Sequence, residues 1–369
     1  MNYFLRGLLA HRQFVIRAAI KSRSVHVFFA IVVLFVATRF GGAEGSGLAS
    51  PLGAQKNMPY LAAEAKIAGD DSWKPKGWGT GEYIDLLPII HAGAVIDMNS
   101  GEVLWSMNLN KKIAPASLTK LATVMTALDL FPKDKTIRVS QSAADQVPTK
   151  LGLIEGEKLS LDEAIKAAIL TSANDATEAI SDSLGKEVGD GTSTFMKLVN
   201  TKLAKIGANN THFETSTGLD HDNHFSTIYD LAIIAHAAKS NYPLISEAAS
   251  QDYARLAPDS NHKLFDLPNW NALLGTYPGV NGLKIGYTGN AGHSTIVTAN
   301  REGRELMAIV TGANSLENRE IAAAMLLNYG FSKHGVEPYA ISDLDLVSRY
   351  EDWHRQLSVG EGEEAQGGS

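Results

Sequence analysis

The period of the hydrophobic pattern changes twice along this chain, and this order limits the folds that the chain can adopt. Two short apolar runs, 91–97 and 102–106, flank an Asn-Ser-Gly turn and indicate a β-hairpin. Helical spacing dominates the middle of the chain. Two further strands, 294–300 and 306–311, precede a last helix over about 316–328. Strands on both sides of a helical region predict an α/β (α+β) sandwich in which an antiparallel sheet joins both ends of the folded part.

The helical middle carries recognisable start and stop signals. Leu118, Leu121, Val124 and Leu128 recur at helical spacing after Pro115, a residue that suits the first position of a helix. Two signals indicate helix starts: a capping box at Ser160–Glu163 before an expected helix over 164–170, and Thr227 before a fourth helix. Two glycines indicate helix ends: Gly207 after an expected helix over 193–206, and Gly330 beyond the last helix.

The N-terminal segment combines positive charge with an apolar run. Residues 1–39 hold several Lys and Arg residues and no acidic residue, and they include the apolar run 25–38. Gly41 and Ala43 give the small-residue pattern of a cleavage site after Ala43. The run is shorter than the roughly 20 residues of a membrane helix, but the basic region is long for a signal peptide. We expect residues 1–43 to be a cleaved signal peptide or a membrane anchor, with the rest outside the cytoplasm.

Composition divides the remaining chain into three parts. Residues 44–87 are rich in Gly, Ala, Pro and Lys and lack sustained periodicity, so we expect a flexible linker. Residues 88–333 hold the patterned elements and form the expected catalytic domain. Residues 334–369 are expected to be a weakly structured tail that is acidic at its end.

Charge and residue usage exclude several classes of function. The net charge is −7 although the first residues are basic, so the rest of the chain is strongly acidic, which argues against nucleic acid as a partner. Without cysteine the chain has no disulfides, no thiol catalysis and no thiolate metal site. His221 and His224 beside Asp220 and Asp222 are interpreted as a surface loop, and we predict no metal and no cofactor.

Three Ser-x-x-Lys patterns occur, and their context separates them. The pattern at Ser183 contains a glycine near an expected helix end, and the pattern at Ser260 lies in a polar loop. Ser117 alone begins a strongly apolar helix. Because positions i and i+3 are neighbours on a helix, Lys120 is expected to lie over Ser117. We interpret Ser117 as a nucleophile in a first helical turn, whose free N–H groups stabilise an oxyanion, and Lys120 as its base.

A lysine can act as a base at neutral pH only if the residues around it lower its pKa. Its pKa must fall from near 10.4 toward 7, a change of about 4 kcal/mol, and burial, a helix N-terminus and a second lysine each favour this. Lys284, in a Lys-Ile-Gly triplet before the late strands, is the candidate second lysine. Ser172 and Asn174 follow an apolar helix and are candidates for proton transfer and for binding a substrate amide. The alternatives are a helix cap for Ser172–Asn174 and a solvated strand residue for Lys284.

Taken together and in this order, the three patterns are typical of penicillin-binding proteins and serine β-lactamases. The segments IAPASLTKLATVMTAL, ILTSANDATEAI, HFETSTGLDHDNHFSTIYDLA and GLKIGYTGNAG resemble the low-molecular-mass D-Ala-D-Ala carboxypeptidases of peptidase family S11. The resemblance covers about residues 89–331. It implies a β-lactamase and transpeptidase-like fold, in which helices cover an antiparallel sheet beside an all-helical subdomain.

The resemblance also implies a function and roles for residues. The chain would be an exported serine D-Ala-D-Ala carboxypeptidase that trims the terminal D-alanine of peptidoglycan stem peptides, and β-lactams would acylate the same serine. Ser117 would be acylated, Lys120 would be its base, and Ser172 would line the opposite wall of the site. The N–H groups of Ser117 and Tyr287 would form the oxyanion hole, and Arg319 would lie near the terminal carboxylate of the substrate. The implied substrate-binding residues are Asn174, Lys284, Tyr287, Thr288 and Arg319.

One position departs from the family pattern, which has Thr where this chain has Ile285. A hydroxyl there would hydrogen-bond the terminal carboxylate, and its loss costs roughly 1.5–3 kcal/mol, on the order of 10- to 100-fold in rate. Thr288 or Arg319 could compensate. Two alternatives therefore stay open: a D,D-endopeptidase of the same family that acts on crosslinks, or a non-catalytic envelope protein that binds penicillin or peptidoglycan. A β-lactamase is disfavoured, since the Glu-x-x-Leu-Asn segment of class A enzymes is missing.

Overall fold

The strands expected at both ends of the folded part meet in one sheet. In the computed structural model, which describes residues 58–69, 72–79, 84, 89–341 and 345–351, a five-stranded sheet has the order β2-β1-β9-β8-β7. All of its neighbouring strands are antiparallel, and β1 from the start of the domain pairs with β9 near its end. This arrangement confirms the expected sandwich. The strands are β1 (Ala92–Asp97), β2 (Val103–Met107), β7 (Val280–Thr288), β8 (Gly292–Arg301) and β9 (Arg304–Ala313).

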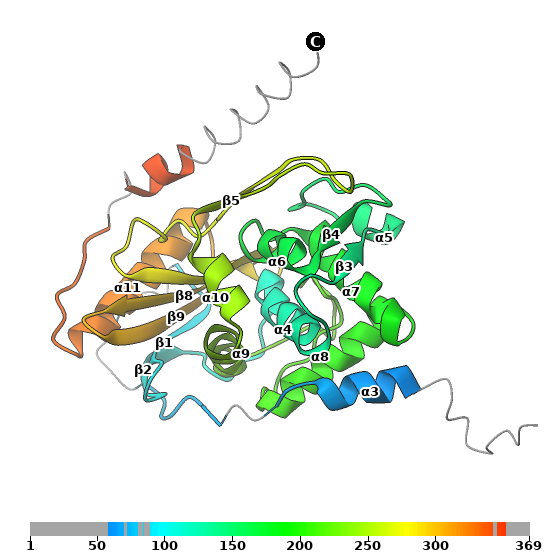
Figure 1. Ribbon diagram of the computed structural model, residues 1–369. Coiled ribbons are helices and arrows are strands. Elements are labelled where there is room, and N and C mark those ends of the chain that lie inside the picture. Colours follow the sequence, from blue (N-terminus) through cyan, green and yellow to red (C-terminus); the bar gives the residue numbers. More distant parts are fainter. Residues whose placement is uncertain (1–57, 70–71, 80–83, 85–88, 342–344, 352–369) are drawn as a thin grey trace, which may run out of the picture. The chain divides into compact units, whose positions relative to one another are not determined.

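Helices cover both faces of this sheet, and most of them form a helical region beside it (Figure 1). Leu306, Ala308 and Val310 of β9 pack into the core under α11, whereas the alternate residues Met307 and Ile309 belong to the core that contains α9. The helices are α3 (Met58–Lys66), η1 (Ala116–Thr119), α4 (Lys120–Leu130), α5 (Gln141–Ala144), α6 (Leu161–Ile169), α7 (Asn174–Val188), α8 (Thr192–Ile206), α9 (Ile228–Asn241), α10 (Pro243–Ser250) and α11 (Leu316–Ser332). Two small hairpins pair β3 (Thr136–Arg138) with β4 (Lys158–Ser160) and β5 (Tyr253–Leu256) with β6 (Phe265–Pro268).

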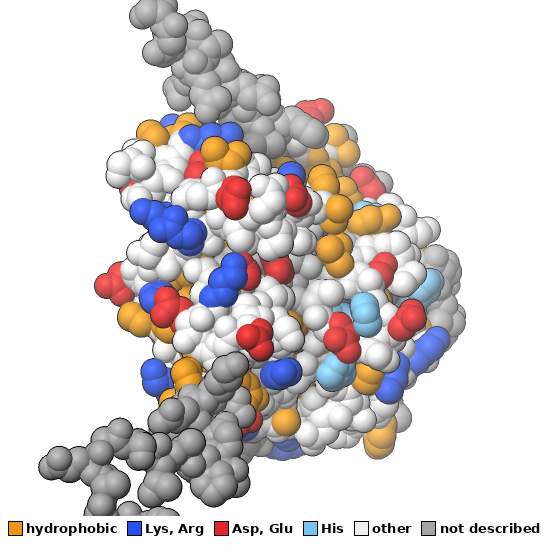
Figure 2. Space-filling model, turned by 90° about the vertical axis from the view of Figure 1, so that its right-hand side faces the viewer, with side chains coloured by type: hydrophobic (Ala, Val, Ile, Leu, Met, Phe, Trp, Pro, Cys, Tyr) orange, Lys and Arg blue, Asp and Glu red, His pale blue; other side chains and the backbone are white. Residues whose placement is uncertain are grey.

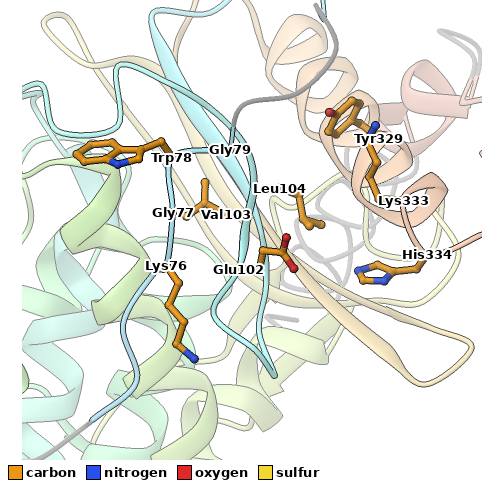
Figure 3. A pocket seen from close by; sticks show the side chains of 10 residues that line it. All are labelled: Lys76, Gly77, Trp78, Gly79, Glu102, Val103, Leu104, Tyr329, Lys333 and His334. Carbon is orange, nitrogen blue, oxygen red and sulfur yellow. The ribbon is translucent and has the colours of Figure 1, made fainter.

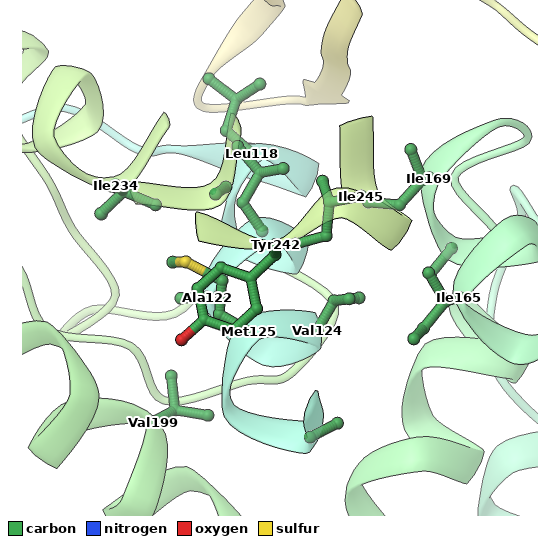
Figure 4. Packing of buried hydrophobic residues seen from close by; sticks show 14 of the residues in the cluster. Leu118, Ala122, Val124, Met125, Ile165, Ile169, Val199, Ile234, Tyr242 and Ile245 are labelled. Atoms are coloured by element: carbon green, nitrogen blue, oxygen red, sulfur yellow. The ribbon is translucent and has the colours of Figure 1, made fainter. Parts of the chain in front are cut away.

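Helix α4 lies at the centre of the helical region. Leu118, Ala122 and Met125, from η1 and α4, are fully buried and lie among residues of the surrounding helices, such as Ile165 of α6 and Val199 of α8 (Figure 4). Burying one such apolar side chain contributes about 1.5–3 kcal/mol. Packing on all sides therefore fixes the position of α4 and of the short 3-10 helix η1 that precedes it.

Most of the expected helix boundaries are confirmed, and two are wrong. Pro115 is the N-cap of the 3-10 helix η1 and not the first residue of an α-helix, which begins at Lys120. Ser160 and Glu163 form a capping box at the start of α6, and Gly207 ends α8 in the left-handed conformation. Gly330, expected beyond the last helix, lies inside α11, which continues to Ser332. A Cβ atom on Gly330 would lie 2.7 Å from Leu306 Cδ1, so glycine serves the close approach of this helix to the sheet rather than its termination.

The expected linker over residues 44–87 is partly structured. Helix α3 contacts α4, α7 and α8, and Ala63 and Ile67 are buried in the core. Residues 72–79 then run beside β2, with Lys76 paired in a parallel bridge to Glu102. Figure 3 shows these residues together with the end of α11 around a pocket that contains none of the predicted site residues. Burial of a few apolar side chains holds this segment, although its sequence lacks helical periodicity.

Part of the expected weakly structured tail is also helical. Residues 345–351 form a helix, and Leu346 is fully buried in the same core as α11. Arg349 of this helix forms an ion pair with Asp252. Val336, just after α11, is buried as well. The described residues 345–351 therefore pack against the domain.

The predicted signal peptide or anchor, residues 1–43, lies outside the described residues. Within the described part of the chain, no helix is both long enough and apolar enough to cross a membrane. On the face of the molecule seen in Figure 2, basic and acidic side chains are interspersed. This face thus lacks the clustered positive charge that is typical of a nucleic-acid-binding surface.

A pair of substitutions tests whether the segment around α3 belongs to the folded domain. Ile67→Ala is expected to lower the free energy of unfolding by about 2–5 kcal/mol, because it leaves a cavity in the core. Leu61→Ala is the matched control, because Leu61 is 54% exposed and its truncation should change stability by less than about 0.5 kcal/mol. Urea unfolding of both variants measures the difference. Equal effects would contradict the packing of this segment.

Candidate active site

The predicted nucleophile and base lie in consecutive elements. Ser117 is in η1, and Lys120 is the first residue of α4. In a 3-10 turn, side chains three residues apart lie one above the other, and Lys120 Nζ is 2.6 Å from Ser117 Oγ. Ala116, just before the nucleophile, has a φ of 49°, which is rare for a residue other than glycine. The backbone thus turns sharply into the helix that carries both groups.

The amino group of Lys120 is removed from water. Its side chain is fully buried, and its Nζ also lies 2.8 Å from Asn174 Oδ1 and 2.9 Å from the carbonyl oxygen of Thr217. With Ser117 Oγ, these atoms provide one partner for each of the three N–H groups of an ammonium ion. The partners are neutral, so burial is not offset by a bonded carboxylate.

Burial changes the protonation of this lysine. Removal from water lowers the pKa of Lys120 to about 7, while the nearby carboxylate of Asp175 acts in the opposite direction. At neutral pH a large fraction of the amine is therefore neutral and can accept the proton of Ser117. The expected second lysine, Lys284, is also buried, and its pKa is lowered well below its usual value by burial and then by the charges of Lys120 and Arg319.

Ser172 and Asn174 lie around the start of α7, and both are buried. Ser172 has a φ of 60° between α6 and α7, and Asn174 is the first residue of α7. The Asn174 amide holds Lys120 through its oxygen and donates from Nδ2 to the carbonyl oxygen of Val147 at 2.9 Å. Both ends of the Asn174 side chain thus have partners within the protein, and its expected role in binding a substrate amide stays a prediction.

Strand β7 forms the other side of the site and is an edge strand of the main sheet. Lys284 is buried, and its Nζ donates to the carbonyl oxygen of Ile285 at 3.1 Å. A Cβ atom on Gly286 would lie 2.9 Å from the backbone nitrogen of Ser117. Glycine at this position lets the strand approach the nucleophile, which brings the backbone of the neighbouring Tyr287 close to Ser117. The Tyr287 side chain itself is 60% exposed.

Two predicted substrate-binding side chains have other partners. The Thr288 hydroxyl donates to Asp220 Oδ1 at 2.6 Å and accepts a hydrogen bond from Ala291 N–H. Thr288 therefore fixes the β7–β8 turn, and its expected contact with substrate stays a prediction. Arg319 of α11 is 1% exposed and forms an ion pair with Glu320. Its Nε and Nη2 atoms donate to Glu320 and to the carbonyl oxygen of Trp270, so its charge is paired within the protein.

Comparison with known proteins agrees with this geometry. The family model for the D-alanyl-D-alanine carboxypeptidases, peptidase family S11, matches residues 88–315. The chain belongs to this family. It is 32% identical over 255 residues to the D-alanyl-D-alanine carboxypeptidase DacF of Bacillus subtilis, with 67% of this chain and 63% of DacF covered. DacD of Escherichia coli is 32% identical over 260 residues, which cover 66% of this chain and 64% of DacD. The chain thus spans less than two thirds of the length of these relatives.

Solved structures of S11 relatives and similar enzymes share the fold. The Streptomyces K15 DD-transpeptidase superposes with a TM-score of 0.63 at 23% identity, over 69% of this chain and 99% of that chain. Penicillin-binding protein D2 of Listeria monocytogenes, solved in an ampicillin-bound form, gives a TM-score of 0.56 at 28% identity, over 68% of this chain and 99% of that chain. These likenesses confirm the expected penicillin-binding-protein fold.

Three parts of this S11 site were missed by the sequence argument. The carbonyl oxygen of Thr217 binds Lys120, and the adjacent Gly218 has a φ of 88°. Asp175 accepts hydrogen bonds from the backbone N–H groups of residues 151–153, so it ties the loop beside the site to α7. The signal for the first two was present, since Thr217 and Gly218 lie in the quoted HFETSTGLDHDN segment. Among the described residues, no group of three or more His, Cys, Asp or Glu side chains is placed to hold a metal ion.

The lowered pKa of Lys120 gives a direct prediction. In protein labelled with 13C-lysine, one side-chain resonance should titrate near pH 7 and disappear in Lys120→Met. Asp175→Asn should move this titration to lower pH, because loss of the negative charge removes a factor that raises the pKa. Both shifts are measured by NMR between pH 5 and 11. A Lys120 resonance that titrates near its ordinary value would contradict the buried geometry.

Gly218 is expected to be intolerant of any side chain. A Cβ atom there would lie 1.9 Å from the carbonyl oxygen of Ala116, next to the nucleophile. Gly303→Ala is the matched control, because Gly303 also has a positive φ but its Cβ would meet nothing within 4 Å. We expect Gly303→Ala to cost about 1 kcal/mol in unfolding free energy and Gly218→Ala to cost about 1–3 kcal/mol more through overpacking. Urea unfolding tests this, and similar costs would contradict the close approach.

Proposed function

We propose that this chain is an exported serine D-Ala-D-Ala carboxypeptidase that acts on peptidoglycan stem peptides and is acylated by β-lactams. The observation that carries the proposal is the fully buried Lys120, whose Nζ lies 2.6 Å from Ser117 Oγ. A neutral amine at that distance is positioned to remove the hydroxyl proton as Ser117 attacks. Membership of the S11 family and the carboxypeptidase names of its relatives support this substrate class.

In the proposed reaction, acylation of Ser117 precedes hydrolysis. Lys120 accepts the proton of Ser117, and Ser117 Oγ forms a bond to the carbonyl carbon of the penultimate D-alanine. The N–H groups of Ser117 and Tyr287 stabilise the oxyanion, an effect worth about 10²–10³ in rate for each donor. Ser172 passes a proton to the leaving nitrogen and takes the proton that Lys120 received from Ser117, the C–N bond breaks, and D-alanine departs. Water then hydrolyses the acyl-enzyme at Ser117.

The location of the enzyme is part of the same proposal. Its substrate class lies outside the cytoplasm, and residues 1–43 have the basic and apolar order of an export signal or anchor. We propose that this segment directs the domain across the membrane or holds it there. The non-catalytic alternative is less well supported, because a protein that only binds would have no need for the buried amine beside Ser117.

Release of D-alanine from a pentapeptide stem is the decisive measurement. The soluble chain from Glu44 onward should release D-alanine and should be labelled by fluorescent penicillin with one label per chain. Ser117→Ala should abolish both, because the nucleophile is lost, and the control variant Ser260→Ala, in the exposed Ser-x-x-Lys pattern, should retain both. Absence of release and of labelling would contradict the proposal. Labelling without hydrolysis of any acyl donor would indicate the binding protein.

A further inference from the structure

An apolar pocket of about 580 Å³ lies beside the site, next to the position where the family threonine is replaced. Its walls include Ile285, Trp270, Leu316 and Tyr350, the last from the helix 345–351. Apolar side chains dominate this lining, so the pocket favours an uncharged occupant over a hydrated ion.

Under the proposed function, this pocket receives the leaving group. Thr149, which also lines it, accepts the backbone N–H of Asn174 at 2.7 Å through its carbonyl oxygen. The pocket therefore adjoins the segment that carries Ser172, the group that gives a proton to the leaving nitrogen. On the other side, Ile285 directly precedes Gly286, which lies against the backbone of Ser117. The pocket thus adjoins both segments between which the proposed function places the leaving group.

The permanent positive charge at the pocket is already neutralised. Arg319 Nε donates to Glu320 Oε1 at 3.1 Å, and its Nη2 donates to the same oxygen and to the carbonyl oxygen of Trp270. Glu320 is fully buried, and within the described part of the chain its Oε2 has no hydrogen-bond partner. A substrate carboxylate would therefore meet an arginine that is already paired and a second carboxylate behind it.

The neighbouring groups do not replace this charge. Ile285 has no donor, and the hydroxyl of Thr288 is bound to Asp220. His293 lines the pocket, and burial together with Arg319 lowers its pKa, so it is neutral at pH 7. Lys284 is buried with its Nζ on the carbonyl oxygen of Ile285, and its pKa is also lowered. An entering carboxylate thus finds no unpaired cation among these residues.

We propose that this pocket selects acyl donors whose leaving group carries no free carboxylate, such as a D-Ala-D-Ala carboxamide or a side-chain amine in a crosslink. The bond chemistry is unchanged: the ester to Ser117 Oγ forms, the C–N bond breaks, the leaving amine takes the proton, and water releases the acyl group. Only the second product differs from free D-alanine. The chain still hydrolyses the D-Ala-D-Ala carboxylate, but more slowly.

Two matched peptides test this specificity. kcat/KM is measured for an N-acylated stem peptide that ends in D-Ala-D-Ala and for the same peptide with a C-terminal carboxamide. The wild-type chain should prefer the carboxamide by about tenfold or more. Glu320→Gln should shift the ratio toward the carboxylate on the order of 10- to 100-fold, because Arg319 then has a charge to offer. Ile285→Thr should shift the ratio in the same direction by adding a hydroxyl donor.

A double variant tests whether the effect of Glu320→Gln comes from the charge of Arg319. Arg319→Gln combined with Glu320→Gln removes both charges, so its ratio should stay within about threefold of the wild-type ratio, unlike that of Glu320→Gln alone. Circular dichroism and the stoichiometry of penicillin labelling report whether each variant is folded. If Glu320→Gln does not fold, the wild-type ratio and Ile285→Thr decide the question.

The outcomes separate this inference from the function on which it rests. A wild-type preference for the free carboxylate, unchanged by Glu320→Gln or Ile285→Thr, overturns the inference and leaves the carboxypeptidase proposal intact. Failure to hydrolyse either peptide, together with failure of penicillin to label Ser117, overturns the proposed function and the inference with it. A carboxamide preference that falls in both single variants supports the inference.

Discussion

The buried amine of Lys120 is the interaction on which the arrangement of the site depends. Its three polar partners come from η1, from the start of α7 and from the loop before α9. Each partner must be in place, because a buried amine that loses a hydrogen bond costs about 1–3 kcal/mol or more. The lysine therefore links three segments that are far apart in the sequence, and the packed core around α4 holds it there.

The same burial provides the chemistry. An exposed lysine would be protonated at pH 7 and could not act as a base. Among the described residues, no carboxylate is in hydrogen-bond contact with Lys120, and Asp175, whose charge raises the pKa of Lys120, accepts hydrogen bonds from the backbone N–H groups of residues 151–153. Burial without a bonded counterion removes the hydration that stabilises the ammonium form, and this lowers the pKa of Lys120. Structure and reactivity at Ser117 thus have one physical cause.

Local sequence patterns predicted the features that are formed by residues close together in the sequence. The hairpin of β1 and β2, the capping box at Ser160 and the i, i+3 pair of Ser117 and Lys120 follow from spacing and side-chain chemistry. The contacts of Thr217 and Gly218 with the site could not be predicted in this way, because they are made by backbone atoms that any residue type carries. Their geometry depends on tertiary packing.

The segments outside the expected domain show a similar limit. Residues 44–87 and 334–369 have weak periodicity, and periodicity is the signal from which elements are predicted. Yet Ile67 and Leu346 are buried, because a single apolar side chain that reaches the core is enough to hold a short segment. Gly330 does not end the last helix. It allows the helix to approach Leu306 of the sheet, a tertiary contact that cannot be predicted from the neighbouring residues in the sequence.

Lys120 and Arg319 are both buried near the active site, but one has neutral partners and the other has a carboxylate partner. This difference explains why the two residues have different roles. Lys120 has neutral partners, so the proton is easily lost and the group is a base. Arg319 forms an ion pair with Glu320, so its charge is cancelled within the protein. A buried ion pair adds little net stability compared with apolar residues of the same size. Its consequence here is therefore electrostatic: beside Ile285, the pair removes the attraction that would otherwise hold a carboxylate in the leaving-group pocket.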